Sequence, residues 1–438
     1  MAVIFRLFLI AQTTSTPRAI DTTILLRTQY FQPYSQQDNA MQNIVIIGTG
    51  FAGLWSALSA KRLINLHNAQ DTIAVTVISP DPHLVMRPRL YEPNAKGMKT
   101  PLTGLLKQSG INFVQGTVST INASDMTLSL DNGETVPYDR LVLAAGSRLR
   151  QPPIPGLAEH AFSIDTLADA SAFESHLLKL ASLSSTSARN TAVVVGGGFT
   201  GIELAAELPS RLRGILGNDQ DIRVVVIEQA SDIGPELGPG PRPVILEALQ
   251  TSGVEMKLGA GLAGIDEEGV TLSTGERIPS LTVLWTAGVE ASPLASQVPG
   301  EKDRLGRVIV DAFLRTPETY EIIITGDAAS ASTDDVGHNA LMSCQHAMPM
   351  GKFAGYNAAA AVLGLELKAY KQEYYGTCLD LGPWGAVVSE GWDRKVMYSG
   401  ADGKKIKQWV NGTVIYPPVD AEEALRKADP VLETVTLA

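Results

Sequence analysis

Two glycine-rich hexapeptides have the residue types and the spacing for chemistry. The first is Gly48–Gly53 (GTGFAG) and the second is Gly196–Gly201 (GGGFTG). In such a loop the first glycine permits a tight turn, the second lets the backbone approach a diphosphate, and the third lets a helix pack against a strand. The helix that follows points N–H groups and its positive dipole end at the phosphates. Each hexapeptide therefore predicts a dinucleotide site.

The residue that ends the next strand after each loop normally contacts the adenosine ribose through a carboxylate. In the second unit this residue is Glu228, which would bond the ribose hydroxyls of NAD and repel the 2′-phosphate of NADP. A preference for NADH is therefore predicted. In the first unit the position holds Ser79, which departs from the pattern, and either Ser79 or the nearby Asp81 is expected to contact the ribose.

Two further stretches favour one flavin and one nicotinamide. Leu141–Gly146 is an apolar strand that enters a turn of small residues, where bulky side chains would collide with a dinucleotide. Asp327 follows another apolar strand, and a short acid there can accept hydrogen bonds from the ribityl hydroxyls of a flavin. A role for Asp327 as a helix N-cap is compatible with this one. The sequence therefore predicts hydride transfer from one dinucleotide to the other.

The elements around each loop supply the context that this mechanism requires. Apolar runs predict parallel strands at 42–47 and 73–78, with a helix at 54–66 between them. The second half repeats the order, with strands at 191–195 and 222–227. The same βαβ architecture is thus expected twice, about 150 residues apart.

The connecting stretches predict smaller elements. Residues 111–135 and 254–278 alternate in the manner of antiparallel strands. The second unit's helix is expected at 202–213, where Pro209 would kink or shorten it. The Ala-rich stretch 348–365 predicts another helix.

Composition narrows the function classes. A chain of 438 residues with 45% hydrophobic residues predicts two or three globular domains. The net charge of −11 argues against nucleic acid as a partner, because a phosphate backbone needs a basic face. Two cysteines without a CxxC spacing exclude a disulfide framework and a paired dithiol centre. No residue grouping has metal-ligand spacing, and no apolar run reaches the roughly 18 residues of a membrane span.

The order of these motifs resembles the FAD-dependent pyridine nucleotide-disulfide oxidoreductases, and within them the type II NADH dehydrogenases. The resemblance runs from about Met41 to about Gly382 and includes Pro88–Tyr91 and Thr282–Pro293 (TVLWTAGVEASP). It implies FAD as the resident cofactor and NADH as the co-substrate. The residues expected to hold FAD are Gly48, Gly50, Phe51, Ala52, Gly53, Ser79, Asp81, Val118, Ala145, Gly146, Gly326, Asp327 and Ala347. Those expected to hold NADH are Gly196, Gly198, Thr200, Gly201, Glu228, Ala287 and Gly288.

The resemblance also implies two catalytic residues. Glu203 matches a glutamate beside the nicotinamide and the flavin ring, where a carboxylate could orient the amide and influence proton delivery. A structural carboxylate near the helix dipole is the alternative role for Glu203. Gln345 matches the first of two glutamines on the acceptor side of the flavin, but Pro349 replaces the second. This replacement argues against quinone as the acceptor, because proline has neither the amide side chain nor a backbone donor.

The fold class that follows is α/β, with two Rossmann-like dinucleotide-binding domains and a small C-terminal cap. The FAD-binding domain is expected at 41–157 and 300–365, with the NAD-binding domain inserted at 158–299. Residues 366–438 are expected to form the cap. Residues 1–40 are interpreted as an over-long gene start before Met41, with a signal or transit segment as the alternative.

The acceptor side leaves several hypotheses open. The first is electron transfer from NADH to a quinone or another small acceptor. The second is reduction of a specialised metabolite or a protein carrier, and the third is a non-enzymatic NADH sensor. Sulfide:quinone oxidoreductases use cysteines near the flavin, so a redox role for Cys344 and Cys378 is a further alternative to two buried structural residues.

The C-terminal part bears on location. Lys404, Lys405 and Lys407 lie next to Trp409 and could meet an anionic membrane, but a solvated strand pair is favoured there. We therefore expect a cytoplasmic protein with weak or absent membrane association, and a homodimer is compatible with the sequence.

Overall fold

A six-stranded sheet holds the first glycine loop. The computed structural model describes residues 41–431, and in it this sheet has the order β20–β21–β9–β1–β2–β5. All neighbours are parallel except the edge pair β20–β21. The strands are β1 (Gln42–Ile47), β2 (Ile73–Ser79), β5 (Asn112–Gln115), β9 (Arg140–Leu143), β20 (Arg315–Thr316) and β21 (Thr319–Ile324). Strand β21, which follows the second unit in the chain, pairs with β9 in this sheet.

A four-stranded parallel sheet holds the second glycine loop. Its order is β13–β12–β11–β17. The strands are β11 (Thr191–Val195), β12 (Arg223–Glu228), β13 (Val254–Leu258) and β17 (Thr282–Trp285). Every residue of β11 and β17 is buried, which is why these strands are continuous apolar runs rather than alternating ones. The two parallel sheets confirm the predicted α/β class.

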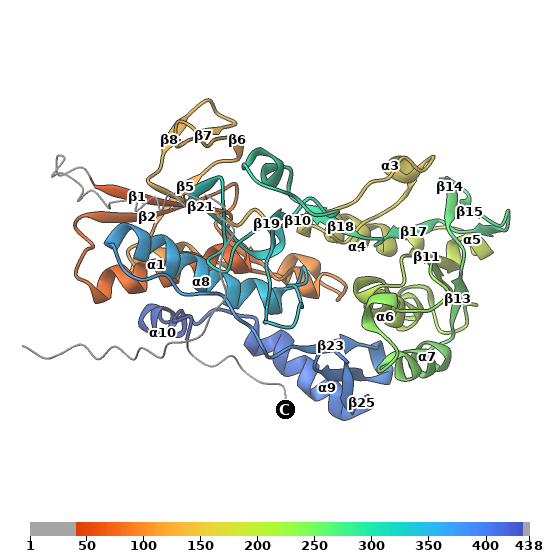
Figure 1. The fold of residues 1–438 in the computed structure, drawn as a ribbon. Coiled ribbons are helices and arrows are strands. Elements are labelled where there is room, and N and C mark those ends of the chain that lie inside the picture. Colours follow the sequence, from red (N-terminus) through yellow and green to blue (C-terminus); the bar gives the residue numbers. More distant parts are fainter. Residues whose placement is uncertain (1–40, 432–438) are drawn as a thin grey trace, which may run out of the picture. The chain divides into compact units, whose positions relative to one another are not determined.

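Three long helices pack on these sheets, and two of them begin at the glycine loops. Helices α1 (Phe51–Leu66) and α6 (Phe199–Leu216) start inside the glycine loops, and α8 (Cys344–Leu363) packs along α1 (Figure 1). Helix α6 runs through Pro209 and continues to Leu216, so the expected shortening was wrong. Helices α1 and α8 approach closely because glycines lie at their contact: a Cβ added at Gly355 would be 2.0 Å from the Ser56 carbonyl oxygen.

Smaller antiparallel sheets extend from both domains. Residues 112–115 had been expected to be antiparallel, but they form β5 at the parallel edge of the first sheet, and antiparallel pairing begins only at β6. The three-stranded sheets are β6 (Val118–Asn122), β7 (Thr127–Leu130) and β8 (Thr135–Pro137), and β14 (Leu262–Asp266), β15 (Gly269–Leu272) and β16 (Arg277–Pro279). The antiparallel strand pairs are β3 (His83–Val85) with β4 (Lys99–Pro101) and β10 (Ser147–Leu149) with β18 (Val289–Ala291). A further pair, β19 (Val308–Ile309) with β22 (Ala329–Ser330), is parallel.

The C-terminal cap combines a sheet with helices. Its strands are β23 (Gly376–Asp380), β24 (Ala386–Glu390) and β25 (Lys395–Ser399), and its helices are α9 (Gly400–Trp409), the π-helix η7 (Val410–Val414) and α10 (Ala421–Lys427). The expected strand pair around Lys404–Trp409 was wrong, because this segment is the helix α9. Gly403 lets α9 lie directly on β24, since a Cβ there would be 2.4 Å from the Ala386 carbonyl oxygen.

The remaining helices are short and connect the sheets. They are α2 (Thr103–Gln108), α3 (Leu157–His160), α4 (Leu167–Leu180), α5 (Ser187–Asn190) and α7 (Arg242–Thr251), with 3₁₀ turns that include η3 (Pro235–Leu237), η5 (Gly326–Ala328) and η6 (Gly382–Trp384). Within residues 41–431 no helix has both the length and the apolar character needed to cross a membrane.

Candidate active site

The first glycine loop has the geometry of a diphosphate cradle. Gly48 has φ +106°, and a Cβ there would be 2.6 Å from the Ala144 carbonyl oxygen, so only glycine fits this turn. A Cβ on Gly53 would be 2.0 Å from the Gly48 carbonyl oxygen. A Cβ on Gly50 would meet nothing within 4 Å, and no side chain caps the N-terminus of α1 there. The loop therefore presents open space in front of uncapped N–H groups.

Other predicted flavin residues gather around this loop. A Cβ added at Gly326 would lie 2.8 Å from the Ala52 side chain and 3.8 Å from that of Ala347. Gly146, at φ +69°, has open space where a side chain would be. The structure thus brings the turn after β9, the turn after β21 and the first turn of α8 to one edge of the sheet. Val118 is buried at the start of β6, where its assignment stays a prediction.

Asp327 lies in a partly buried cluster of charges. Its Oδ2 accepts a hydrogen bond of 2.6 Å from the Ser147 hydroxyl and lies 3.8 Å from the Arg87 guanidinium. Arg87 also donates to Ser147 and pairs with Asp165. Burial raises the pKa of Asp327, although the Ser147 hydrogen bond and the Arg87 charge oppose this shift. Asp327 is in the 3₁₀ turn η5, before β22, and does not cap a long helix.

The two candidates for the first ribose contact have different surroundings. The buried Ser79 hydroxyl is 3.0 Å from the Thr49 hydroxyl, so it is tied to the glycine loop itself. The Asp81 carboxylate is exposed and pairs with the His83 ring. Ser79 is therefore the better-placed of the two beside the loop.

The second glycine loop repeats the tight turn of the first. Gly196 has φ +113°, and a Cβ there would lie 2.9 Å from the Ala287 amide nitrogen. A Cβ on Gly201 would be 1.8 Å from the Gly196 carbonyl oxygen. Thr286, which sequence reasoning missed, donates its hydroxyl to the Gly196 carbonyl and so ties the turn after β17 to the loop. Ala287 and Gly288 are thereby placed beside the loop, as expected.

Glu228 is fixed at the second loop by backbone groups. Its Oε2 accepts from the Gly197 N–H at 2.7 Å and its Oε1 accepts from the Ala230 N–H at 2.8 Å. The carboxylate is half-buried at the end of β12, beside the turn that Gly196–Gly201 makes. This arrangement places a negative charge where the sequence predicted a ribose contact.

Glu203 is at the centre of a buried polar cluster. Its side chain is only 4% exposed, and its Oε1 accepts hydrogen bonds from Lys407 Nζ at 2.7 Å and from the Asp380 N–H at 3.0 Å. Lys407 also donates to the Cys378 carbonyl at 3.1 Å. Burial raises the pKa of Glu203 to about 7, and the Lys407 charge opposes this shift. Helix α6, strand β23 and helix α9 thus meet at one ionisable pair.

The cluster continues through Asp380. Its Oδ2 accepts from the Tyr91 hydroxyl at 3.0 Å and its Oδ1 accepts from Lys404 Nζ at 2.6 Å. The π-helix η7 contributes Asn411, whose amide donates to the Tyr91 oxygen at 3.3 Å and to Glu92 at 2.8 Å. Burial raises the pKa of Tyr91 well above its ordinary value, so Tyr91 is a neutral hydrogen-bonding group.

Gln345 lies at the other end of the same strand. When the side-chain amide of Gln345 is oriented so that its nitrogen and its oxygen are both hydrogen-bonded, the nitrogen donates to the Gly376 carbonyl. The oxygen then accepts from the Gly376 N–H at 3.0 Å. Gly376 begins β23 and Asp380 ends it, so one five-residue strand contacts both predicted catalytic residues. Pro349 is buried inside α8, one turn beyond Gln345, and offers no polar group there.

The two cysteines have environments that disfavour thiolate chemistry. Both are free, and burial raises the pKa of Cys344 to about 11 and that of Cys378 to about 12. A reactive cysteine normally has a lowered pKa, because the thiolate is the nucleophile. His346 stacks on the Tyr375 ring and is hydrogen-bonded to Gln372, and burial lowers its pKa to about 4.

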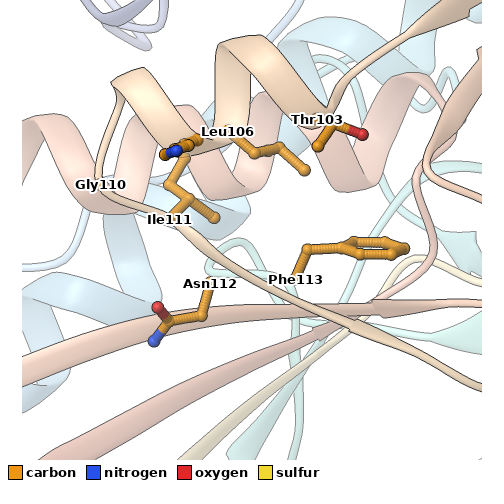
Figure 2. Close-up of a pocket in the computed structure, with 7 residues that line it drawn as sticks. Thr103, Leu106, Gly110, Ile111, Asn112 and Phe113 are labelled. Carbon is orange, nitrogen blue, oxygen red and sulfur yellow. The ribbon is translucent and has the colours of Figure 1, made fainter.

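Two other features carry no assignment. A surface hollow lies between α2 and the start of β5 (Figure 2), lined by Thr103, Leu106, Lys107, Gly110, Ile111, Asn112 and Phe113. It is at the amino end of β5, whereas parallel sheets bind dinucleotides beyond the carboxyl ends of their strands. Among residues 41–431 no group of His, Cys, Asp and Glu side chains could hold a metal ion.

Lys407 and Asp380 are the functional candidates that sequence reasoning missed. Lys407 is 204 residues from Glu203, and only its place in a basic stretch drew attention to it. A single buried ion pair between distant segments leaves no local pattern, so no sequence signal could have found this pair.

Comparisons with known proteins agree with this geometry. Residues 42–351 match the family model described as pyridine nucleotide-disulphide oxidoreductase. An NADH dehydrogenase-like protein of Mycobacterium tuberculosis is 43% identical over 88% of this chain and 96% of its own length. The demethylphylloquinone reductase of Synechocystis is 30% identical over 80% of this chain and 87% of its own length. The solved NDH2 of Plasmodium falciparum in complex with NADH has a similar fold, with a TM-score of 0.71 at 14% identity over 88% of this chain and 97% of that one.

Proposed function

Because this chain belongs to the pyridine nucleotide-disulphide oxidoreductase family and is an FAD-dependent oxidoreductase that oxidises NADH, we propose that it passes the electrons to a quinone. The observation that carries the proposal is β23, which contacts Glu203 at one end and Gln345 at the other. The strand thereby holds the carboxylate that we assign to the donor side and the amide that we assign to the acceptor side at a fixed spacing. Relatives that are named as quinone reductases support the same acceptor class.

The residues at the first loop fit a flavin dinucleotide. Gly50 leaves open space in front of the uncapped N-terminus of α1, and Gly146 leaves open space after β9. We assign the diphosphate to the first of these places and the ribityl chain to Asp327, whose carboxylate can accept hydroxyl hydrogen bonds. When bound, FAD supplies the ring that takes a hydride from NADH and gives the electrons up again.

The residues at the second loop fit NADH. The N-terminus of α6 supplies donors for the diphosphate, and Glu228 supplies a carboxylate for the ribose hydroxyls. The same negative charge would repel the extra phosphate of NADPH. We therefore assign the nicotinamide dinucleotide to Gly196–Gly201, Glu228 and the turn Ala287–Gly288.

Glu203 and Lys407 are assigned to proton handling. A carboxyl group with a pKa of about 7 can hold a proton or release it near neutral pH, as a general acid or base must. Lys407 holds the Glu203 carboxylate in one orientation at 2.7 Å, and the Asp380 N–H restrains the same oxygen. Lys407 is thus a positioning residue for Glu203.

On the side of the flavin that we assign to the acceptor, Gln345 matches the first of the two glutamines of the type II NADH dehydrogenases, and Pro349 stands in place of the second. Gln345 is restrained by the backbone of Gly376, while Pro349 contributes only apolar surface. A quinone needs few polar contacts because its ring is largely apolar, and one oriented amide can direct it. The loss of the second glutamine is therefore compatible with quinone reduction.

The decisive experiment is an anaerobic titration of the purified yellow protein with NADH, followed by mixing with acceptors. We expect bleaching of the flavin absorbance by one equivalent of NADH. Reoxidation by menadione or ubiquinone-1 should then be much faster than by oxygen or by a ferredoxin. A protein without flavin, or a flavin that NADH fails to reduce, would overturn the family assignment of the activity. Fast reoxidation by ferredoxin or oxygen alone would overturn the quinone proposal and leave NADH oxidation intact.

A further inference from the structure

The N-terminus of α6 already has a negatively charged neighbour. Oε1 of Glu236, a residue on the turn η3, accepts a hydrogen bond of 3.3 Å from the Phe199 N–H. A Cβ added at Gly198 would lie 2.8 Å from the same oxygen. The Glu236 carboxylate therefore lies beside Gly198, the second glycine of the loop. This is the position where the backbone closely approaches a diphosphate.

The turn that bears Glu236 is held against the loop by other contacts. The Gly234 N–H donates to the Gly197 carbonyl at 2.9 Å, and Leu237 is buried. Arg242 donates to the Ile233 carbonyl at 3.1 Å and so restrains the start of the turn. These anchors are thus independent of the Glu236 side chain, which is itself exposed.

Among residues 41–431, the first glycine loop has no such neighbour. A Cβ on Gly50, the counterpart of Gly198, would meet nothing within 4 Å. The two loops differ in this respect although their glycine spacing is the same. The open loop is the one assigned to the resident cofactor, and the loop with the carboxylate is assigned to the dinucleotide that must leave in every turnover.

We propose that Glu236 sets the affinity of the nicotinamide dinucleotide site: in the free protein its carboxylate takes the place of the dinucleotide diphosphate at the Phe199 N–H, and binding displaces it. This inference rests on the assignment of the dinucleotide to the second loop. A displaced carboxylate lowers affinity in two ways. The Phe199 hydrogen bond must be broken first, and the nearby negative charge then opposes the incoming diphosphate.

Weaker binding of this kind favours turnover. An interaction made equally with substrate and product does not speed the chemical step, and tight binding slows product release. Glu236 would return to the Phe199 N–H as the oxidised dinucleotide leaves.

The test measures equilibrium binding of ADP-ribose and NAD to the FAD-loaded protein by calorimetry. ADP-ribose contains the diphosphate and lacks the nicotinamide, so it isolates the contact at α6. Both Glu236→Gln and Glu236→Ala should bind each ligand about two- to fivefold more tightly, the range expected for one charge at a helix terminus. Asp232→Asn removes an equal charge from the same segment but from a side chain paired with Arg242, and it should leave both affinities unchanged.

A second readout does not depend on ligand affinity. In the ligand-free protein, Glu236→Ala should speed hydrogen exchange at the Phe199 amide, because its acceptor is lost. In the ADP-ribose complex the variant and the wild type should exchange alike. If Glu236→Ala has the same unfolding temperature as the wild type, the faster exchange reports a local change at the Phe199 amide.

The outcomes separate this inference from the proposed function. A wild-type protein that binds neither ADP-ribose nor NAD would overturn the assignment of the second loop itself. Normal wild-type binding with unchanged affinity in both Glu236 variants would overturn the Glu236 inference alone. Weaker binding in the variants would also overturn it, since Glu236 would then be a ligand of the dinucleotide.

Discussion

The Glu203 carboxylate is subject to two opposing influences. Burial favours its neutral form and raises its pKa to about 7, whereas the Lys407 charge and the Asp380 N–H favour the ionised form. The result is a group that changes its protonation near neutral pH while remaining fixed in place. Such groups are typical of sites where protons are transferred.

The first prediction concerns this protonation. Glu203→Gln should lower kcat with a quinone by about ten- to a hundredfold while FAD remains bound. Below about pH 7 Glu203 holds its proton and above that pH it loses it, so the wild-type rate of acceptor reduction should show an inflection near pH 7. Stopped-flow measurements of this rate from pH 5.5 to 8.5 would show whether the inflection is lost in Glu203→Gln. Glu207→Gln, one helical turn away, is the matched control and should keep the inflection; a Glu203→Gln profile like that of the wild type would contradict the role.

The second prediction concerns the ion pair as a structural unit. At pH 8.5, where Glu203 of the wild type is ionised, Lys407→Met leaves the buried carboxylate without its partner and should lower the free energy of unfolding by about 3–5 kcal/mol. The double variant Glu203→Gln/Lys407→Met has no unpaired charge, so it should recover much of that loss. Urea unfolding of the four proteins measures the coupling. Additive effects of the two substitutions would show that the pair contributes nothing as a pair.

The third prediction concerns cofactor choice. Glu228→Gln can still accept from the Gly197 N–H, but it loses the charge that repels a 2′-phosphate. The ratio of kcat/KM for NADH to that for NADPH should fall about fivefold, which corresponds to about 1 kcal/mol between a charged and a neutral hydrogen bond. Glu255→Gln on the neighbouring β13 serves as the control and should retain the wild-type ratio. A wild-type preference for NADPH would reject the assignment of Glu228.

At the scale of elements, the contact between α1 and α8 determines how close the flavin loop lies to the turn before α8. Gly355→Ala would place a Cβ 2.0 Å from the Ser56 carbonyl oxygen, so the helices must separate. We expect a loss of stability of at least about 1–3 kcal/mol and faster FAD release. Gly214→Ala in α6 is the control, because a Cβ there meets nothing within 4 Å. It should stabilise the protein by about 0.5–1 kcal/mol through helix propensity. Flavin fluorescence and thermal unfolding report both effects, and normal FAD retention in Gly355→Ala would contradict the packing argument.

Elements differ in how far the sequence could predict them, and burial explains the difference. Strands β1 and β11 have the bounds expected from the sequence, because buried parallel strands are largely continuous apolar runs. Helix α9 was expected to be a strand pair. Its two glycines lower the intrinsic preference for a helix, and tertiary contact with β24 overrides that preference.

The residues of the candidate site also differ in how far the sequence could predict them. The glycine loops and Glu228 were predictable because their spacing follows from local geometry. The ion pair of Glu203 with Lys407 was not, because it forms only when segments 204 residues apart are packed together. Gln345 was named as a candidate from the sequence, but its restraint by Gly376 depends on the position of β23, which no local pattern specifies.

At the scale of the whole molecule, one hydrophobic cluster runs through both parallel sheets. It includes Ile44 of β1, Ala354 of α8, Leu204 of α6 and Val226 of β12. We therefore expect the holoprotein to unfold in one cooperative transition, with flavin release and loss of circular dichroism at the same temperature. ADP-ribose at a hundred times its Kd should raise both midpoints together, since it would add about 2.7 kcal/mol to the folded state. Flavin release well below the loss of secondary structure would contradict this coupling.

Strand β23 contacts Gln345, Lys407 and Glu203 through main-chain atoms: the N–H and carbonyl of Gly376 bond Gln345, the carbonyl of Cys378 accepts from Lys407, and the N–H of Asp380 donates to Glu203. The Cys378 thiol takes part in none of them. Substitution at 378 would consequently change a buried side chain on this strand without removing any of the main-chain hydrogen bonds that hold Glu203, Lys407 and Gln345.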